Sequence, residues 1–271
     1  LNTTAQRKAF AEYFFQHDPY KNHIVLHTHP GKHEEVYTPL LGQASKFSGP
    51  SIQNSWGNIH RVTKKWVEAS AQAGKPWVVA SDEQGGSRTG VPHDAYTGSP
   101  SQDDIRNSVL WGNLMAGGAG VEYYFGYDLP HSDLTCEDFR SRDRMWDYNR
   151  YAHQFFTTYL PFWQMENHNE LIGNTTDRRD FLCFADPGNI YAIYRKYGSI
   201  ELDLQQFGQE TEQTPGAFQE SDGLVIMEAE SVPAGGGWSK KYNDGVIFYE
   251  ASNNHLGNTN GGNLNFEIAV R

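Results

Sequence analysis

The chain of 271 residues is 38% hydrophobic and 14% aromatic, which is enough apolar material for a substantial folded core and argues against disorder. Its 33 acidic and 22 basic residues give a formal net charge of −11, the wrong sign for binding along a phosphate backbone. No run in the sequence approaches the about 18 to 20 apolar residues that span a bilayer. We therefore expect neither nucleic acid as a partner nor a membrane span.

The first part of the chain alternates between helix-like and strand-like patterns. Helical spacing of apolar residues covers residues 5–16, 58–71, 100–116 and 137–159. Short apolar strands are predicted over residues 23–26, 76–80 and 121–125. Since these strands are too far apart in the chain to form hairpins, the alternation favours a parallel sheet in an α/β fold.

The pattern changes at about residue 180. Beyond this point the sequence predicts short strands separated by Gly, Pro, Asn and Asp. Residues 189–194 and 199–204 flank a turn and are predicted to form an antiparallel hairpin, and further strands are predicted over 224–229, 246–249 and 264–270. The two cysteines, Cys136 and Cys183, are too few for a zinc cage; a single disulfide and two separate buried thiols both remain open.

The strand at 76–80 runs directly into Ser81-Asp82-Glu83-Gln84-Gly85-Gly86. A buried strand that ends in acids and an amide delivers them to the C-terminal edge of a parallel sheet, where α/β barrels hold their active sites. Because consecutive strand residues point to opposite faces, we expect Asp82 and Glu83 not to face one substrate together. Glu83 is the first catalytic candidate, and ordinary solvent-facing polarity is the alternative.

The strand at 23–26 is followed by His27-Thr28-His29, so two imidazoles alternate on one side of an extended segment. This arrangement suits a metal site. His60 lies early in a predicted helix and His93 in a loop, so neither supplies the further ligand at a strand end that such a site requires. Substrate hydrogen bonding and plain loop polarity are the alternatives to metal binding.

Aromatic and acidic residues end the strand at 121–125, in the run Gly120 to Asp128. With Trp56 and Trp111, residues such as Tyr124 could offer flat faces to sugar rings, although most of the aromatic residues must serve the core. The sequence has no Gly-x-Ser-x-Gly motif, and neither cysteine has an evident His partner. Carboxylate chemistry in a sugar-shaped cleft is the interpretation that remains.

Several stretches resemble bacterial glycoside hydrolases that carry an N-terminal module of unknown function before a TIM-type barrel. The resemblance covers about residues 5–205 and is carried by residues 76–84, 111–128, 141–143 and 161–163. By analogy with barrels of the large retaining clan, the acid/base follows strand 4 and the nucleophile follows strand 7. Glu83 falls at the second of these positions. The resemblance therefore implies a retaining, two-carboxylate mechanism.

This mapping makes the strand-like segments, including the region around 49–53, strands 5 to 8 of a (β/α)8 barrel. A full barrel needs about 250 residues. We therefore expect residues 1–165 to form its C-terminal part, with about four βα units, and Leu1 to be a cut. The missing N-terminal half would be a partner and would supply the acid/base. Asn169-Glu170 follows the last barrel helix, and we do not take it as the acid.

The tail Gly223 to Glu230, followed by Gly-Gly-Gly-Trp238, resembles the opening strand of a carbohydrate-binding β-sandwich. In related modules, acids in this strand help to hold a structural calcium ion, which would make Glu228 and Glu230 ligands here; exposed strand acids are the alternative. The resulting domain prediction is the barrel part over 1–165, a small antiparallel β domain over 166–222, and the start of a sandwich over 223–271.

These observations predict a secreted, periplasmic or cell-surface glycoside hydrolase that cleaves a polysaccharide or oligosaccharide and needs no cofactor for catalysis. Glu83 would be the nucleophile, and Asp82 would orient or tune it. Sugar subsites would be lined by residues His27, His29, Gln53, Gln84, Trp56, Trp111 and Tyr124. Two alternatives remain: a metal-dependent hydrolase that uses His27 and His29, and a non-catalytic carbohydrate-binding protein.

Overall fold

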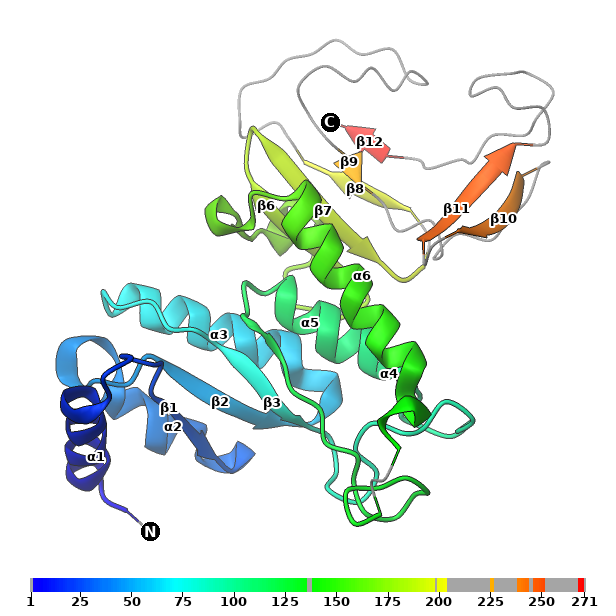
Figure 1. Ribbon diagram of the computed structural model, residues 1–271. Helices are drawn as coiled ribbons and strands as arrows, with labels where there is room; N and C mark the ends of the chain where they lie inside the picture. The colour runs from blue at the N-terminus through cyan, green and yellow to red at the C-terminus, as the bar shows by residue number, and fades with distance from the viewer. Residues whose placement is uncertain are drawn as a thin grey trace. The chain divides into compact units, whose positions relative to one another are not determined.

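The computed structural model describes residues 2–135, 138–197, 199–203, 225–226, 238–243, 246–251 and 268–270. The chain divides into two units, Leu1–Trp146 and Asp147–Arg271, each of which has its own sheets (Figure 1). Over the described residues, none of the helices combines the length and the apolar character needed to cross a membrane.

The first unit is built on a four-stranded parallel sheet with the order β1-β2-β3-β4; Figure 1 labels β1, β2 and β3. Its strands are β1 (Val25–Thr28), β2 (Gly49–Asn54), β3 (Ala80–Gln84) and β4 (Gly120–Val121). Each neighbouring pair is parallel. The predicted α/β fold with a parallel sheet is thereby confirmed, and closure into a barrel stays a prediction.

Helical segments precede, connect and follow these strands. The longer helices are α1 (Thr4–His17), α3 (Ile59–Gln72) and α6 (Asp143–Tyr159), and α6 contains the boundary between the two units. The shorter helical segments of this unit are η1 (Pro30–Lys32), α2 (His33–Tyr37), η2 (Thr38–Leu40), η3 (Gly42–Ala44), η4 (Trp56–Asn58), α4 (Gln102–Ile105), the π-helix η5 (Arg106–Leu110), α5 (Trp111–Leu114) and η6 (Phe139–Arg142). The predicted helix over 100–116 is therefore three joined segments.

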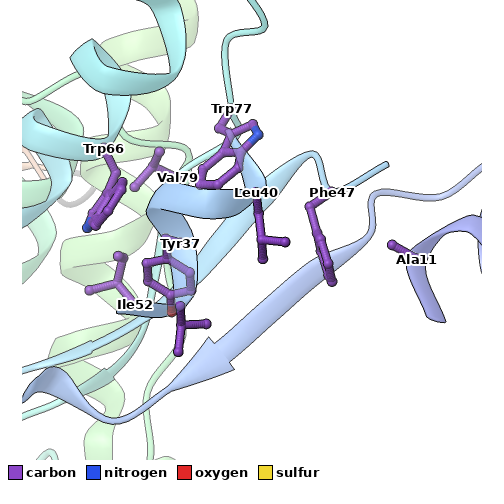
Figure 2. Close-up of a cluster of buried hydrophobic side chains, with 9 residues drawn as sticks. Ala11, Tyr37, Leu40, Phe47, Ile52, Trp66, Trp77 and Val79 are labelled. Atoms are coloured by element: carbon purple, nitrogen blue, oxygen red, sulfur yellow. The ribbon is translucent and has the colours of Figure 1, made fainter. Parts of the chain in front are cut away.

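An aromatic cluster forms the core beside β2 and β3 (Figure 2). The Tyr37 ring meets Trp66 edge-on at 5.2 Å and Trp77 at 6.4 Å between centroids, and all three side chains are buried with Ile52. Edge-to-face aromatic pairs add about 0.5 to 1.5 kcal/mol beyond the burial of their area. The Tyr37 hydroxyl also donates to the Ser51 carbonyl at 3.0 Å, which ties this core to β2.

The second unit contains an antiparallel three-stranded arrangement of β5 (Glu166–Asn167), β6 (Phe181–Asp186) and β7 (Ile190–Arg195), to which β9 (Val225–Ile226) adds in parallel. Its short helical segments are η7 (Phe162–Gln164) and η8 (Asn169–Ile172). The remaining strands are β8 (Ile200–Leu202) with β12 (Ile268–Val270) and β10 (Trp238–Asn243) with β11 (Val246–Ala251). Its buried core includes Cys183, a free thiol on β6.

The predicted hairpin between residues 189–194 and 199–204 is wrong. Strand β7 pairs with β6 instead, and β8 pairs with β12. The turn that closes the observed hairpin is Pro187-Gly188-Asn189, where Gly188 has a φ of 87° and the Asn189 amide donates to the Asp186 carbonyl at 3.0 Å. Glycine adopts this left-handed conformation without a Cβ clash, which allows the tight turn between β6 and β7.

Candidate functional site

Strand register brings the candidate residues to one end of the parallel sheet. His27 on β1 is the register partner of Ser51 on β2, and Gln53 on β2 is the partner of Glu83 on β3. The register between β2 and β3 shifts after Ile52. Ile52 is opposite Ser81 and the next residue, Gln53, is opposite Glu83, so Asp82 is an extra residue on β3. Such a β-bulge re-aims the side chains that follow it. Here it places Glu83, rather than Asp82, opposite Gln53.

Both oxygens of the Glu83 carboxylate face a nitrogen atom from a neighbouring strand. The Gln53 Nε2 donates to Oε1 at 2.6 Å, and the His27 Nε2 lies 3.4 Å from Oε2. The side chain of Glu83 is 25% exposed and that of His27 is 47% exposed. The carboxylate is therefore fixed in orientation and still reachable from solvent, which is the combination that a nucleophile needs.

Ser51 belongs to this cluster and was missed by the sequence-based reasoning. Its hydroxyl lies 3.0 Å from the His27 Nδ1, and the residue is buried. The signal that could have found it is the period of two along a strand, which places Ser51 and Gln53 on the same face. His33 lies nearby: burial lowers its pKa, and a hydrogen bond with the Gln53 backbone opposes part of this shift.

Tyr124 approaches the cluster from the loop after β4. Burial raises the pKa of its hydroxyl well above the ordinary value, and the negative charges of Glu83 and Asp133 raise it further. The hydroxyl oxygen is buried and has no hydrogen-bond partner among the residues that the structure describes. Since buried polar atoms are nearly always paired, this unpaired hydroxyl beside Glu83 is an exception.

The loops after β3 and β4 are locked together by two glycines. Gly90 and Gly126 have φ values of 55° and 69°. A Cβ atom at Gly90 would lie 2.4 Å from the Gly126 nitrogen, and one at Gly126 would lie 2.5 Å from the Arg88 carbonyl oxygen. Only glycine permits this close approach of two backbones. The Val91 amide donates to the Tyr124 carbonyl at 2.9 Å, so the contact also fixes the position of Tyr124.

Arg142 holds the same two loops from inside. It is fully buried, and its Nε donates to the Val91 carbonyl at 3.0 Å while its Nη1 donates to the His131 carbonyl at 2.6 Å. Its guanidinium also lies over the Phe125 ring, 4.0 Å from the centroid. One cation therefore connects the loop after β3 with the loop after β4.

Two of the predicted site residues lie close to Glu83 in the chain fold. Trp56, in η4 just after β2, is partly exposed, and a Cβ at Gly85 would lie 3.4 Å from its ring, so it stands beside the end of β3. Asp82 is partly buried. The burial of Tyr37 raises the pKa of the Tyr37 hydroxyl, and the negative charge of Asp82 raises this pKa further. Asp82 thus lies within electrostatic reach of Tyr37.

The other predicted residues do not join this open face. Gln84 is completely buried because it follows Glu83 on the strand and points to the opposite side. Trp111 is 3% exposed, on the buried side of α5. His29 is exposed, and its Nδ1 accepts a hydrogen bond from the Gly31 amide at 3.3 Å, which caps η1.

Metal binding was a second prediction for His27 and His29. Within the described part of the chain, no group of three or more His, Cys, Asp or Glu residues is arranged to hold a metal ion. Glu228 and Glu230, the predicted calcium ligands, lie outside the described residues. The predicted metal sites therefore stay predictions.

Comparison with known proteins adds no further constraint. No family model, no curated protein and no solved structure matches the chain. Function has to be argued from the geometry of the cluster around Glu83.

Proposed function

We propose that Glu83 is the nucleophile of a retaining glycoside hydrolase that acts on a polysaccharide or oligosaccharide. The observation that carries the proposal is the carboxylate at the C-terminal end of β3, whose two oxygens face the Gln53 amide and the His27 imidazole while the side chain stays accessible. Parallel α/β sheets hold their active sites at this end. The partly exposed Trp56 supplies an aromatic face for a sugar ring.

In this mechanism the ionised Glu83 attacks the anomeric carbon as the bond to the leaving oxygen breaks, and a carboxylic acid about 5 Å away protonates that oxygen. Water then attacks the glycosyl ester, and the same acid, now a base, takes its proton. The groups that the structure records against the Glu83 carboxylate are an amide and an imidazole. As the resemblance implies, the acid/base of this proposal follows an earlier strand of the barrel. The proposal also has the protein act at the cell surface, in the periplasm or outside the cell.

The direct test is Glu83→Gln in the full-length enzyme. We expect turnover to fall by at least about 1,000-fold, equivalent to about 4 kcal/mol of transition-state free energy, with substrate binding kept. The matched control is Glu68→Gln on the exposed face of α3, where Glu68 pairs with Lys64 at 3.9 Å. A fluorinated glycoside should label Glu83, as mass spectrometry of peptides would show, and the product should keep its anomeric configuration.

Three outcomes would favour other functions. Turnover at the wild-type rate by Glu83→Gln would show that Glu83 is not the nucleophile. Loss of activity with a strong chelator would favour the metal-dependent hydrolase. Binding to polysaccharide by the wild-type enzyme without release of reducing ends would favour a carbohydrate-binding protein.

A further inference from the structure

Both ring nitrogens of His27 already face protein atoms. The Nδ1 lies 3.0 Å from the Ser51 hydroxyl, and the Nε2 lies 3.4 Å from the Glu83 Oε2. Sequence reasoning placed His27 in a sugar subsite, but one ring nitrogen is hydrogen-bonded to Ser51 and the other is turned toward the Glu83 carboxylate. We infer that His27 is a positioning residue for Glu83, held in place by Ser51; this inference rests on the proposed role of Glu83 as nucleophile.

Proton placement supports this role. A carboxylate only accepts hydrogen bonds, so a favourable contact across the 3.4 Å between the His27 Nε2 and Glu83 calls for the proton on Nε2. In the neutral imidazole the Nδ1 is then an acceptor, and the Ser51 hydroxyl donates to it. In the imidazolium the Nδ1 donates and the same hydroxyl accepts. Because serine can do either, the Nε2–H contact to Glu83 persists in both protonation states.

The support continues into the core. Ser51 is 6% exposed, so water competes little for its hydroxyl. Its backbone carbonyl accepts from the hydroxyl of Tyr37, which is fully buried among Trp66 and Trp77 (Figure 2). A group that must be held within about 0.5 Å is best supported by side chains that are themselves locked by packing. Tyr37 and Ser51 satisfy this condition, and they hold the half-exposed ring of His27 from its Nδ1 side.

Burial also excludes the competing interpretation of these atoms. A serine, a histidine and a glutamate in line are the components of a nucleophilic triad. Here, however, Ser51 lies within β2 and is buried, while Glu83 is the member that solvent reaches. The geometry orients the carboxylate and does not activate the hydroxyl.

The first test is spectroscopic and needs no activity. Nitrogen-15 spectra of the histidine rings, recorded where the ring is neutral, should show His27 with its Nε2 protonated and its Nδ1 bare. The signal is assigned among the 11 histidines by its loss in His27→Gln. In Glu83→Ala the two neutral tautomers should both be populated, because the acceptor that selects Nε2–H is gone. A bare Nε2 in the wild type, or no change in Glu83→Ala, overturns the inference.

The second test is kinetic and uses the full-length enzyme. We expect His27→Ala to lower kcat by about 10- to 100-fold with KM changed less than about threefold, since misplacement by about 1 Å costs about 100-fold and no substrate contact is lost. His27→Gln keeps a donor and should recover part of the loss. The matched control is His23→Ala. The His23 Nδ1 lies 3.2 Å from the Ser48 hydroxyl, so it is also a histidine–serine pair, with His23 just before β1 and Ser48 just before β2.

The outcomes separate the two proposals. A rise in KM with kcat kept, or an equal loss in His23→Ala, overturns the positioning role of His27. Full activity of Glu83→Gln overturns the proposed function, and the spectra then still decide whether His27 and Glu83 form the predicted pair.

Discussion

The two units of this chain use their buried and half-buried polar groups in different ways. In the parallel sheet, hydrogen bonds between side chains join residues that are 24 and 30 positions apart, His27 to Ser51 and Gln53 to Glu83. In the second unit, β6 and β7 form a hairpin that is closed by one turn, so its pairing is local. A parallel sheet collects side chains from distant segments at one edge, and a hairpin does not.

Two buried asparagines of the second unit bond its backbone. The Asn169 Oδ1 accepts from the Cys183 amide at 2.9 Å, and the Asn174 Nδ2 donates to the Phe181 carbonyl at 2.7 Å. Glu170, which follows Asn169, is exposed and pairs with the His168 Nδ1 at 2.7 Å. The Asn169-Glu170 sequence is therefore structural. An accessible carboxylate that neighbouring strands hold, such as Glu83, is a better indication of a catalytic site.

The largest expected effect lies at the loops of the first unit. Arg142→Ala should lower the free energy of unfolding by about 3 kcal/mol, because it leaves the Val91 and His131 carbonyls without their donor and removes the contact with Phe125. Urea denaturation measures this loss. Arg140→Ala is the control, since Arg140 is exposed and pairs with Asp138. Equal stability of the two variants would show that the buried cation does not hold these loops.

A smaller effect is expected in the second unit. Asn169→Ala should cost about 2 kcal/mol, because the buried Cys183 amide would lose its acceptor while Asn169 also bonds Asp177 at 3.1 Å. Asn189→Ala is the control, since the Asn189 side chain bonds Asp186 at the exposed turn. If denaturation showed Asn189→Ala to be the more damaging change, the turn rather than the buried amide would organise this unit.

Sequence reasoning predicted the parallel sheet because its signal is coarse. Strands that are separated by helical stretches cannot form hairpins, and this holds even where the strand boundaries are shifted. The predicted strand over 76–80, for example, is observed as β3 at Ala80–Gln84. The hairpin prediction failed because two turn signals, one on each side of β7, compete, and only the pairing with β6 decides between them.

The site was only partly predictable. Glu83 could be selected because it follows an apolar strand, and Gln53 only because the resemblance places a strand around residues 49–53. The sequence alone does not show the bulge at Asp82, because a bulge depends on how β3 is aligned with β2. It therefore could not show which of the adjacent residues Asp82 and Glu83 is opposite Gln53. The contact between Ser51 and His27 depends on register in the same way. Gln84 was included because it is polar, although its position on the strand points it inward.

The smallest effect concerns the one thiol that the structure describes. Burial raises the pKa of Cys183 from 9.0 to about 12. Above about pH 9 the unfolded chain therefore releases this proton while the folded chain keeps it, so the contribution of Cys183 to stability falls as pH rises toward the folded pKa. Between about pH 8 and about pH 10 the loss should be about 1 kcal/mol.

Comparison of the wild type with Cys183→Ala isolates this contribution, because every other titrating group is shared and the small cavity in the variant costs the same at both pH values. We expect denaturation curves to show the wild type losing about 1 kcal/mol of its stability relative to Cys183→Ala on going from about pH 8 to about pH 10. A constant difference would mean that the thiol titrates alike in the folded and unfolded chain. The core around β6 would then be open to water, and the contrast between an accessible carboxylate in one unit and a closed interior in the other would fail.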